Sequence, residues 1–153
     1  MLYMPFYGIY IFAMAFSRRK RRRAQVPDGL AVKRSATGLG LFALRPFPKG
    51  ARIIEYVGRT ISADEAYTSR SKYLFEISSR RTIDGKPRRN PAGYINHSCR
   101  PNCIPEIVRG RIFIEALRPI KAGEELGYDY GGEYFDEHIK PIGCRCHACG
   151  PRP

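Results

Sequence analysis

The chain is organised around the segment GYINHSCRPNC, residues 93–103. Its last eight residues hold two amides, an imidazole and two thiols. Pro91 and Pro101 argue against a long helix or strand here. We therefore predict a polar loop, and such loops on a rigid scaffold commonly bind ligands. Asn96 and His97 can each donate and accept hydrogen bonds, so the pair suits the adenine edge of a nucleotide-like ligand.

The C-terminal region contains three thiols within six residues, Cys144-Arg-Cys146-His-Ala-Cys149. This C-x-C-x-x-C spacing favours a metal site, and tetrahedral Zn²⁺ needs four ligands. Cys99 is the natural fourth ligand and would tie the loop to the C-terminal region. Two alternatives stay open: the cysteines are unrelated buried or disulfide-bonded residues, or His147 replaces one thiol. Cys103 is left over, and we expect it to be a small buried apolar residue.

Length and composition indicate one domain. The chain has 153 residues, 43% of them hydrophobic, and a net charge of +13 from 27 basic and 14 acidic side chains. A domain of this size can bury one core. Metal-type cysteine spacing without a convincing secretory signal favours a reducing, intracellular compartment. The positive charge fits acidic or nucleic-acid-associated partners, although a merely soluble cationic surface would show the same balance.

Two unusual segments precede the expected domain. Residues 1–16 are apolar and aromatic, but a membrane span needs about 20 such residues. One interpretation is that translation starts at Met14, so that the residues before it are an artefact of the gene model. The other is that they form a membrane-attached segment. The run Arg18–Arg23 is too charged to pack, so we expect it to be disordered. It could bind phosphate backbones or act as a nuclear address.

Short strands should dominate from Leu30 onward. β-branched and aromatic runs bounded by turn residues predict strands at 31–34, 41–44, 52–57, 73–77 and 81–84, and a hairpin over 106–115. The hairpin should turn at Arg109-Gly110. Ser62 and Glu65 match a capping box, which predicts one short helix from Ala63 to Arg70. The result is a mainly β, β-rich α+β domain.

Three motifs together resemble one known family. Asn-His-Ser-Cys-x-Pro-Asn at residues 96–102 is followed by Glu-Glu-Leu-Gly-Tyr-Asp-Tyr-Gly at 124–131 and by the cysteine-rich C-terminal region. This combination resembles the SET-domain protein lysine methyltransferases with a post-SET zinc motif, over about residues 28–149. The resemblance implies small curved sheets with a threaded, knot-like C-terminal segment. It divides the chain into an N-terminal segment 1–27, a SET domain 28–135 and a post-SET zinc region 136–153.

The resemblance also implies S-adenosyl-L-methionine as cofactor, Zn²⁺ as a structural metal, and a set of site residues. Tyr130 would be the catalytic tyrosine, Tyr128 would tune the number of methyl groups added, and Tyr56 would line the lysine channel. Cofactor-contacting positions would be Thr37, Gly38, Leu39, Tyr73, Asn96 and His97. Metal ligands would be Cys99, Cys144, Cys146 and Cys149. We expect Gly38-Leu-Gly40 to lie in a turn between two strands, and alone this element is weak evidence, because glycines serve any tight turn.

Methyl transfer to lysine sets physical demands that tyrosines can meet. The amine must be unprotonated, which costs about 4.6 kcal/mol at pH 7. An apolar channel beside a cationic cofactor favours the neutral amine. A tyrosine ring can wall such a channel while its hydroxyl provides a rigid polar contact. A hydroxyl at Tyr128 can hold a water that crowds an already methylated amine, so we predict mainly mono-methylation, with di-methylation as the extension.

We therefore predict a monomeric protein-lysine N-methyltransferase that acts on a histone or on another DNA- or ribosome-associated protein. It would be nuclear in a eukaryote and cytoplasmic or nucleoid-associated in a prokaryote, with possible nucleic-acid contact through its basic residues and no expected membrane partner. The alternative is a non-catalytic, basic, zinc-stabilised module that binds chromatin or nucleic acid. The intact Tyr130, Asn96 and His97 argue against that alternative. A membrane-surface protein would rest only on residues 1–23.

Overall fold

Short strands make up most of the domain. The computed structural model describes residues 25–86 and 89–150. Within these ranges there are ten strands and five short helical segments, so the predicted mainly β fold is confirmed. The first strand begins at Leu30, where the sequence predicts folded structure to start.

The predictions for the N-terminal segment fall outside the described residues. They concern the apolar residues 1–16, a start at Met14 and the basic run Arg18–Arg23. Within the part of the chain that the structure describes, no helix is both long and apolar enough to cross a membrane.

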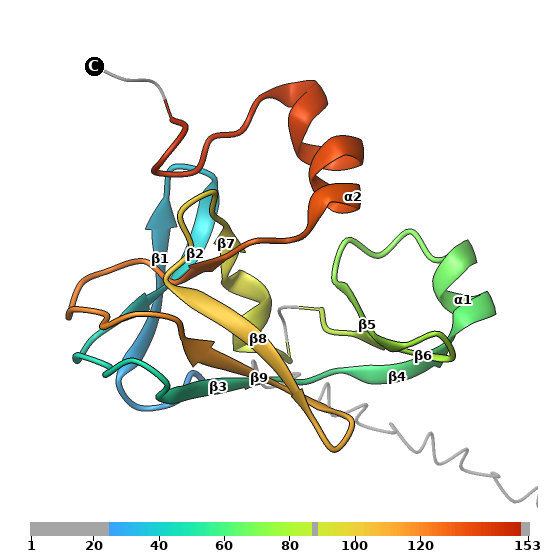
Figure 1. Ribbon diagram of the computed structural model, residues 1–153, viewed down its shortest axis with the longest axis horizontal. Helices are drawn as coiled ribbons and strands as arrows, with labels where there is room; N and C mark the ends of the chain where they lie inside the picture. Colours follow the sequence, from blue (N-terminus) through green and yellow to red (C-terminus); the bar gives the residue numbers. More distant parts are fainter. Residues whose placement is uncertain (1–24, 87–88, 151–153) are drawn as a thin grey trace, which may run out of the picture.

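The strands form four small sheets (Figure 1). Two antiparallel three-stranded sheets have the orders β3-β9-β8 and β4-β6-β5, while β1-β2 is an antiparallel pair and β7-β10 a parallel one. A parallel pair needs a long return of the chain between its strands. The bounds are β1 (Leu30–Ser35), β2 (Gly38–Ala43), β3 (Arg52–Tyr56), β4 (Arg59–Ser62), β5 (Leu74–Ser78), β6 (Arg81–Asp84), β7 (Asn96–His97), β8 (Cys103–Val108), β9 (Arg111–Ala116) and β10 (Gly127–Tyr128).

Most of the expected strands form where local patterning placed them. The β8–β9 hairpin turns at Arg109 and Gly110, whose φ angles are 51° and 74°. Positive φ at both central residues is the turn geometry that matches the twist of a hairpin. The prediction for the Gly38-Leu-Gly40 element was wrong in detail. These residues lie in β2, paired with β1, and the turn is made by Ala36 and Thr37.

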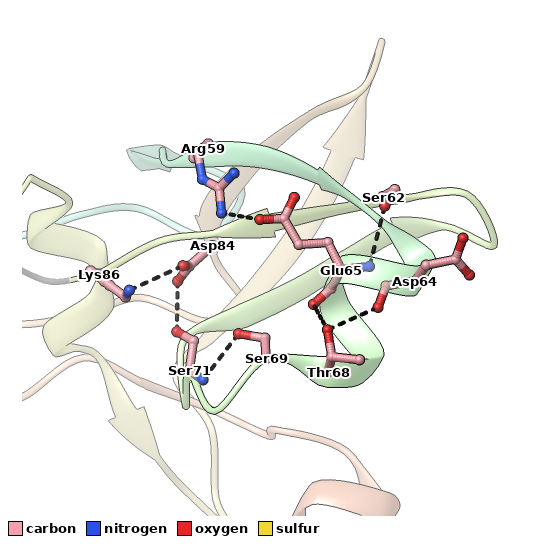
Figure 2. A network of polar contacts seen from close by, with 9 residues as sticks. All are labelled: Arg59, Ser62, Asp64, Glu65, Thr68, Ser69, Ser71, Asp84 and Lys86. Atoms are coloured by element: carbon pink, nitrogen blue, oxygen red, sulfur yellow. Dashed lines mark hydrogen bonds and ion pairs between the residues drawn. The ribbon is translucent and has the colours of Figure 1, made fainter.

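Helix α1 (Ala63–Thr68) begins at the predicted cap. Ser62 Oγ accepts a hydrogen bond from the Glu65 backbone N–H at 3.2 Å. The Glu65 carboxylate pairs with Arg59 of β4 (Figure 2). The helix ends at Thr68, two residues before the predicted Arg70, because Ser69 adopts an extended conformation and its N–H closes the last turn onto Ala66.

A polar network braces the loop between α1 and β5 (Figure 2). Ser71 Oγ donates to Asp84 Oδ1 at 2.6 Å and accepts from the Tyr73 backbone N–H at 3.3 Å. Lys86 pairs with the other oxygen of Asp84 at 3.5 Å. In Figure 1 this loop, α1 and the β4-β6-β5 sheet form one lobe beside the β3-β9-β8 sheet. The network therefore holds the backbone at Tyr73, directly before β5.

The expectation of a single small helix was wrong. A second helical region runs through α2 (Gly132–Tyr134), a π-helical turn η2 (Phe135–Ile139) and a 3₁₀ turn η3 (Lys140–Ile142). Glycines with positive φ, Gly131 at 89° and Gly143 at 79°, bound this region. A further 3₁₀ turn, η1, spans Pro91–Tyr94. Gly-Gly at the start and a proline near the end made the C-terminal region resemble a loop in the sequence.

The core packs against the segment 93–103, called the Asn-His loop from here on. Its fully buried aliphatic side chains come from several sheets and from the loop itself: Leu41, Ile95, Ile112, Ile114, Ile120 and Leu126. The core also contains Asn102, which is only 4% exposed. Its Nδ2 donates to Glu125 O at 2.8 Å, and its Oδ1 accepts from Gly127 N at 2.9 Å. Asn102 thus holds the returning segment beside the loop, as the predicted threaded topology requires.

Asn102→Ala should lower the free energy of unfolding by about 2–5 kcal/mol, because it leaves a buried N–H and a buried C=O without partners. Denaturant unfolding of the full chain measures this. Arg100→Ala, an exposed change in the same loop, should stay within about 0.5 kcal/mol of the unmodified chain. A loss below about 1 kcal/mol for Asn102→Ala would contradict this role, because it would be less than one unsatisfied buried group.

Candidate functional site

Aromatic side chains from β3, β5, β10, η1 and α2 line a cavity of about 460 Å³. Six of its lining residues are tyrosines, and a phenylalanine joins them: Tyr56, Tyr73, Tyr94, Tyr128, Tyr130, Tyr134 and Phe75. Lys72 is the one charged side chain among the described residues that line this cavity. The cavity is therefore a partly open pocket with aromatic walls that carry hydroxyl groups.

A second cavity, of about 700 Å³, adjoins the first. The two share five lining residues, namely Thr37, Lys72, Asn96, Tyr130 and Tyr134. All of the predicted catalytic and cofactor-contacting residues line one or both cavities. Tyr56, Tyr128, Leu39 and Tyr73 line the first, and Gly38 and His97 line the second. The structure thus brings together residues that lie up to 93 positions apart in the sequence.

Tyr56 is fixed in one wall by its neighbours. Its hydroxyl donates to the Tyr73 carbonyl at 3.0 Å, and its ring packs against Phe75. A Cβ on Gly85 would lie 2.2 Å from the Tyr56 ring. Asn90, which is fully buried, donates to the Gly85 carbonyl at 3.0 Å. Absence of a side chain at Gly85 therefore makes room for the ring.

Tyr130 projects its hydroxyl toward the loop. Its Oη donates to the Ile95 carbonyl at 2.6 Å, and its backbone N–H donates to His97 Nδ1 at 3.3 Å. Burial raises the pKa of Tyr130 well above its ordinary value. Burial also raises the pKa values of Tyr56 and Tyr128. All three phenols therefore stay protonated and uncharged at neutral pH.

His97 connects the cavities to the cysteines. Burial lowers the pKa of its imidazole, against a smaller opposing effect of Asp129, so the ring is neutral at pH 7. Because Nδ1 accepts from Tyr130, the remaining proton is assigned to Nε2, which lies 3.3 Å from Cys99 Sγ. The ring also packs edge-on against Tyr130, with a centroid distance of 5.5 Å.

The four predicted metal ligands converge. The Sγ atoms of Cys99, Cys144, Cys146 and Cys149 all lie within 4.8 Å of one another. The Cys99–Cys144 Sγ distance is 3.8 Å. Tetrahedral zinc with Zn–S bonds of about 2.3 Å places its sulfurs about 3.8 Å apart, whereas a disulfide needs about 2.05 Å. The donor set therefore fits Zn²⁺.

The structure decides between the alternatives for the cysteines. All five are free thiols, which excludes the disulfide-bonded arrangement. His147 is not part of the four-thiol group. Cys103 lies apart, 1% exposed, and donates to Asn102 Oδ1, as expected for a small buried residue. Burial acts to raise the pKa of Cys146, but hydrogen bonds from Cys99 N, the Cys144 thiol and nearby backbone amides outweigh it and lower the pKa to about 7.

Several residues at the site were not predicted from the sequence. Tyr94 and Tyr134 complete the aromatic wall, but they lie in helical turns that no periodic pattern announced. Asn90 and Asn102 were not selected as structural residues, although both are almost fully buried amides. Two asparagines next to prolines, in Asn90-Pro91 and Pro101-Asn102, were the available signal for backbone-anchoring amides.

Fold and site together define a β-rich domain whose tyrosine-lined cavity adjoins a four-thiol cluster. The SET domain family matches residues 38–131, more than half of the chain, so the chain belongs to that family. SET methyltransferases use S-adenosylmethionine as the methyl donor.

Curated relatives match over most of this chain. "Histone-lysine N-methyltransferase 2D" of Homo sapiens is 38% identical over 146 residues, which is 86% of this chain but 3% of the relative. "Histone-lysine N-methyltransferase trr" of Drosophila melanogaster is 39% identical over 145 residues, 86% of this chain and 6% of the relative. "Histone-lysine N-methyltransferase, H3 lysine-4 specific" of Schizosaccharomyces pombe is 37% identical over 148 residues, 88% of this chain and 15% of the relative. The chain therefore spans a small fraction of each relative.

Proposed function

We propose that this protein is an S-adenosyl-L-methionine-dependent protein-lysine N-methyltransferase. The observation that carries the proposal is the position of Tyr130, which lines both cavities and whose hydroxyl donates to the Ile95 carbonyl at 2.6 Å. The tyrosine-lined cavity would admit the lysine side chain, and the cavity bordered by Gly38, Asn96 and His97 would admit the cofactor. S-adenosyl-L-methionine supplies an electrophilic methyl group when bound.

The chain's own residues would position and neutralise the amine. No carboxylate is among the described residues that line the tyrosine-lined cavity, and Lys72 places a positive charge there. An incoming ammonium ion would therefore find no anionic partner in this lining, and the charge of the bound cofactor would further favour the neutral amine. Tyr130 keeps its proton on the Ile95 carbonyl, which leaves its oxygen lone pairs free to interact with the amine and with the transferring group. Holding these groups in line supplies much of the rate enhancement.

We propose that Cys99, Cys144, Cys146 and Cys149 hold one structural Zn²⁺. The metal would join the Asn-His loop to the C-terminal region, and its binding would be part of folding. Through the contact between Cys99 Sγ and His97 Nε2, it would also hold the imidazole that accepts from the Tyr130 backbone.

A histone lysine is the proposed substrate. The names of the relatives specify histone lysine, and one specifies lysine 4 of histone H3. The net charge of +13 suits a location close to nucleic acid, where histones are found. Nuclear location in a eukaryote and a monomeric state belong to the same proposal.

Methyl transfer from labelled S-adenosylmethionine tests the proposal directly. The 153-residue chain should label a lysine in histone H3, with purified ribosomal proteins as a parallel substrate set and Tyr130→Phe as the inactive control. Label on ribosomal proteins alone would replace the histone substrate but keep the reaction. Binding of S-adenosylhomocysteine without transfer to any of these proteins would support the non-catalytic binding module instead.

Tyr128→Phe should shift the product from mono- toward di- and trimethyl-lysine. Tyr128 is 9% exposed, and its ring lies 5.0 Å from that of Tyr130, so its hydroxyl is placed to limit space for a methylated amine. Mass spectrometry of a peptide substrate over time measures the product distribution. The first methylation should stay within about threefold of the unmodified rate, because the wall itself is kept. An unchanged distribution would contradict the role of this hydroxyl.

A further inference from the structure

Glu125 connects chain segments that border the proposed cofactor site. Its Oε1 accepts a hydrogen bond from Asn96 Nδ2 at 2.7 Å, and its Oε2 accepts one from Ser35 Oγ at 2.8 Å. Ser35 ends β1 directly before the turn that carries Thr37, and Asn96 begins β7. A single carboxylate thus fastens the β1–β2 turn to the Asn-His loop.

These contacts fix which way the Asn96 amide faces. Its Nδ2 also donates to the Leu39 carbonyl at 3.1 Å, so both N–H bonds are directed at acceptors of the protein. No described residue donates to Oδ1 of Asn96, and Asn96 lines both cavities. A flipped amide would place Oδ1 against a carboxylate and a carbonyl, which repel it. The amide therefore offers an acceptor, which a ligand ammonium or amino group requires.

Gly40 makes room for the carboxylate. A Cβ on Gly40 would lie 2.3 Å from Glu125 Oε1 and 2.9 Å from its Cδ. Gly38 has a different reason to be glycine, since its φ is 124° and the space around it is open. The two glycines of the G-x-G element thus serve separate physical needs: one backbone conformation and one close approach.

We propose that Glu125 is a positioning residue for the cofactor: its carboxylate holds the Asn96 amide so that Oδ1 meets a donor group of the ligand. The inference rests on the proposed function, which supplies the ligand's chemical class. The adjacent Glu124 has no such contact. Its carboxylate pairs with Arg118 at 2.9 Å and accepts from Lys121 N at 2.8 Å, so it provides a matched control.

Calorimetric binding of S-adenosylhomocysteine to the full chain tests the inference. Glu125→Ala should raise the dissociation constant at least about tenfold, or about 1.4 kcal/mol. Glu125→Gln keeps an acceptor for Asn96 and should lose less than about threefold, and Glu124→Ala should stay within about twofold. Each dissociation constant is measured on protein that melts cooperatively, so that a loss of stability is not mistaken for a loss of affinity. At saturating cofactor, kcat of Glu125→Ala should remain within about threefold, while KM for S-adenosylmethionine rises.

Gly40→Ala adds an independent test. The new Cβ should displace the carboxylate and weaken binding as Glu125→Ala does. Because both changes act through the same contact, the double variant should bind no more weakly than the weaker single variant. Additive losses would overturn the inference. So would equal affinities for Glu125→Ala and Glu124→Ala.

Failure of the proposed function can be distinguished from failure of the inference about Glu125. If the unmodified chain does not bind S-adenosylhomocysteine, the proposed function and the inference fall together. If the unmodified chain binds it and Glu125→Ala binds it equally well, only the inference falls. Should Glu125→Ala not fold, Ser35→Ala decides, since it removes one of the two bonds that hold the carboxylate. It should weaken binding about two- to fivefold, and unchanged affinity would overturn the proposal.

Discussion

Tyr130→Phe should lower kcat for lysine methylation by about 100-fold or more, the effect of removing one preorganised polar group from a transition state. The change deletes the hydroxyl that Ile95 holds at 2.6 Å and keeps the ring, which packs against His97 and Tyr128. Affinity for S-adenosylhomocysteine should stay within about threefold, because the lost interaction is made mainly in the transition state. Single-turnover methylation and calorimetry measure the two quantities separately.

Tyr67→Phe is the matched control for this change. Tyr67 lies on α1 and is 94% exposed, so removal of its hydroxyl should leave kcat within about twofold, as for a surface change away from the site. If Tyr130→Phe instead raised only KM for the peptide, the hydroxyl would bind substrate without favouring the transition state. An unchanged kcat would remove Tyr130 from the proposed mechanism.

Loss of the metal should have the second large effect, on stability. The purified chain should contain one zinc per molecule, and Cys146→Ser should lose it, because that side chain is 6% exposed within the four-thiol group. Structural zinc sites contribute several kcal/mol or more to folding, with apparent binding free energies of about 10–16 kcal/mol in small domains. We therefore expect the melting midpoint of Cys146→Ser to fall by more than about 10 °C, the change that about 2.5–5 kcal/mol produces in a domain of this size.

Elemental analysis and thermal melting, each with and without a strong chelator, check this expectation. Cys103→Ala is the control: it also removes a buried thiol, but one outside the four-thiol group. It should keep the zinc and lose only about 1 kcal/mol, the amount that a small cavity costs. A zinc-free chain whose melting does not respond to the chelator would contradict the metal site.

Zinc removal should also lower activity in the molecules that remain folded. Cys99 lies 3.3 Å from His97 Nε2, and His97 Nδ1 accepts from the Tyr130 backbone N–H. These two hydrogen bonds connect the four-thiol cluster to the tyrosine of the proposed mechanism. We therefore expect the metal-bound cluster to stabilise the wall between the cavities as well as the fold.

Local signals predicted the elements whose geometry depends on a few neighbouring residues. Arg109-Gly110 marked the hairpin because a two-residue turn needs positive φ, and Ser62 marked the start of α1 because a hydroxyl can cap the first turn. The C-x-C-x-x-C spacing marked three members of the four-thiol group for a similar reason, since thiols so close together in the chain readily converge. In each case the physical cause lies within a few residues of chain.

Other features of the site depend on contacts between distant segments. The β7–β10 pair has only two residues in each strand, too few for any periodic pattern. Tyr94 and Tyr134 reach the same cavity as Tyr130 only because the folded chain brings η1 and α2 to it. The helical region after Gly131 could not be inferred from its glycines and its proline, because packing against Tyr130 and His97 stabilises it.

The sequence by itself determined the class of fold, the extent of the domain's strands, the four thiols and most of the residues that line the site. These follow from side-chain chemistry and from spacing along the chain. Only the tertiary structure decided which atoms meet: that Glu125 binds Asn96 and Ser35, that Gly40 must leave room for it, and that Ile95 holds the Tyr130 hydroxyl. Hydrogen bonds between segments 29 to 90 residues apart form when the core packs, and the identity of a residue does not disclose its partner.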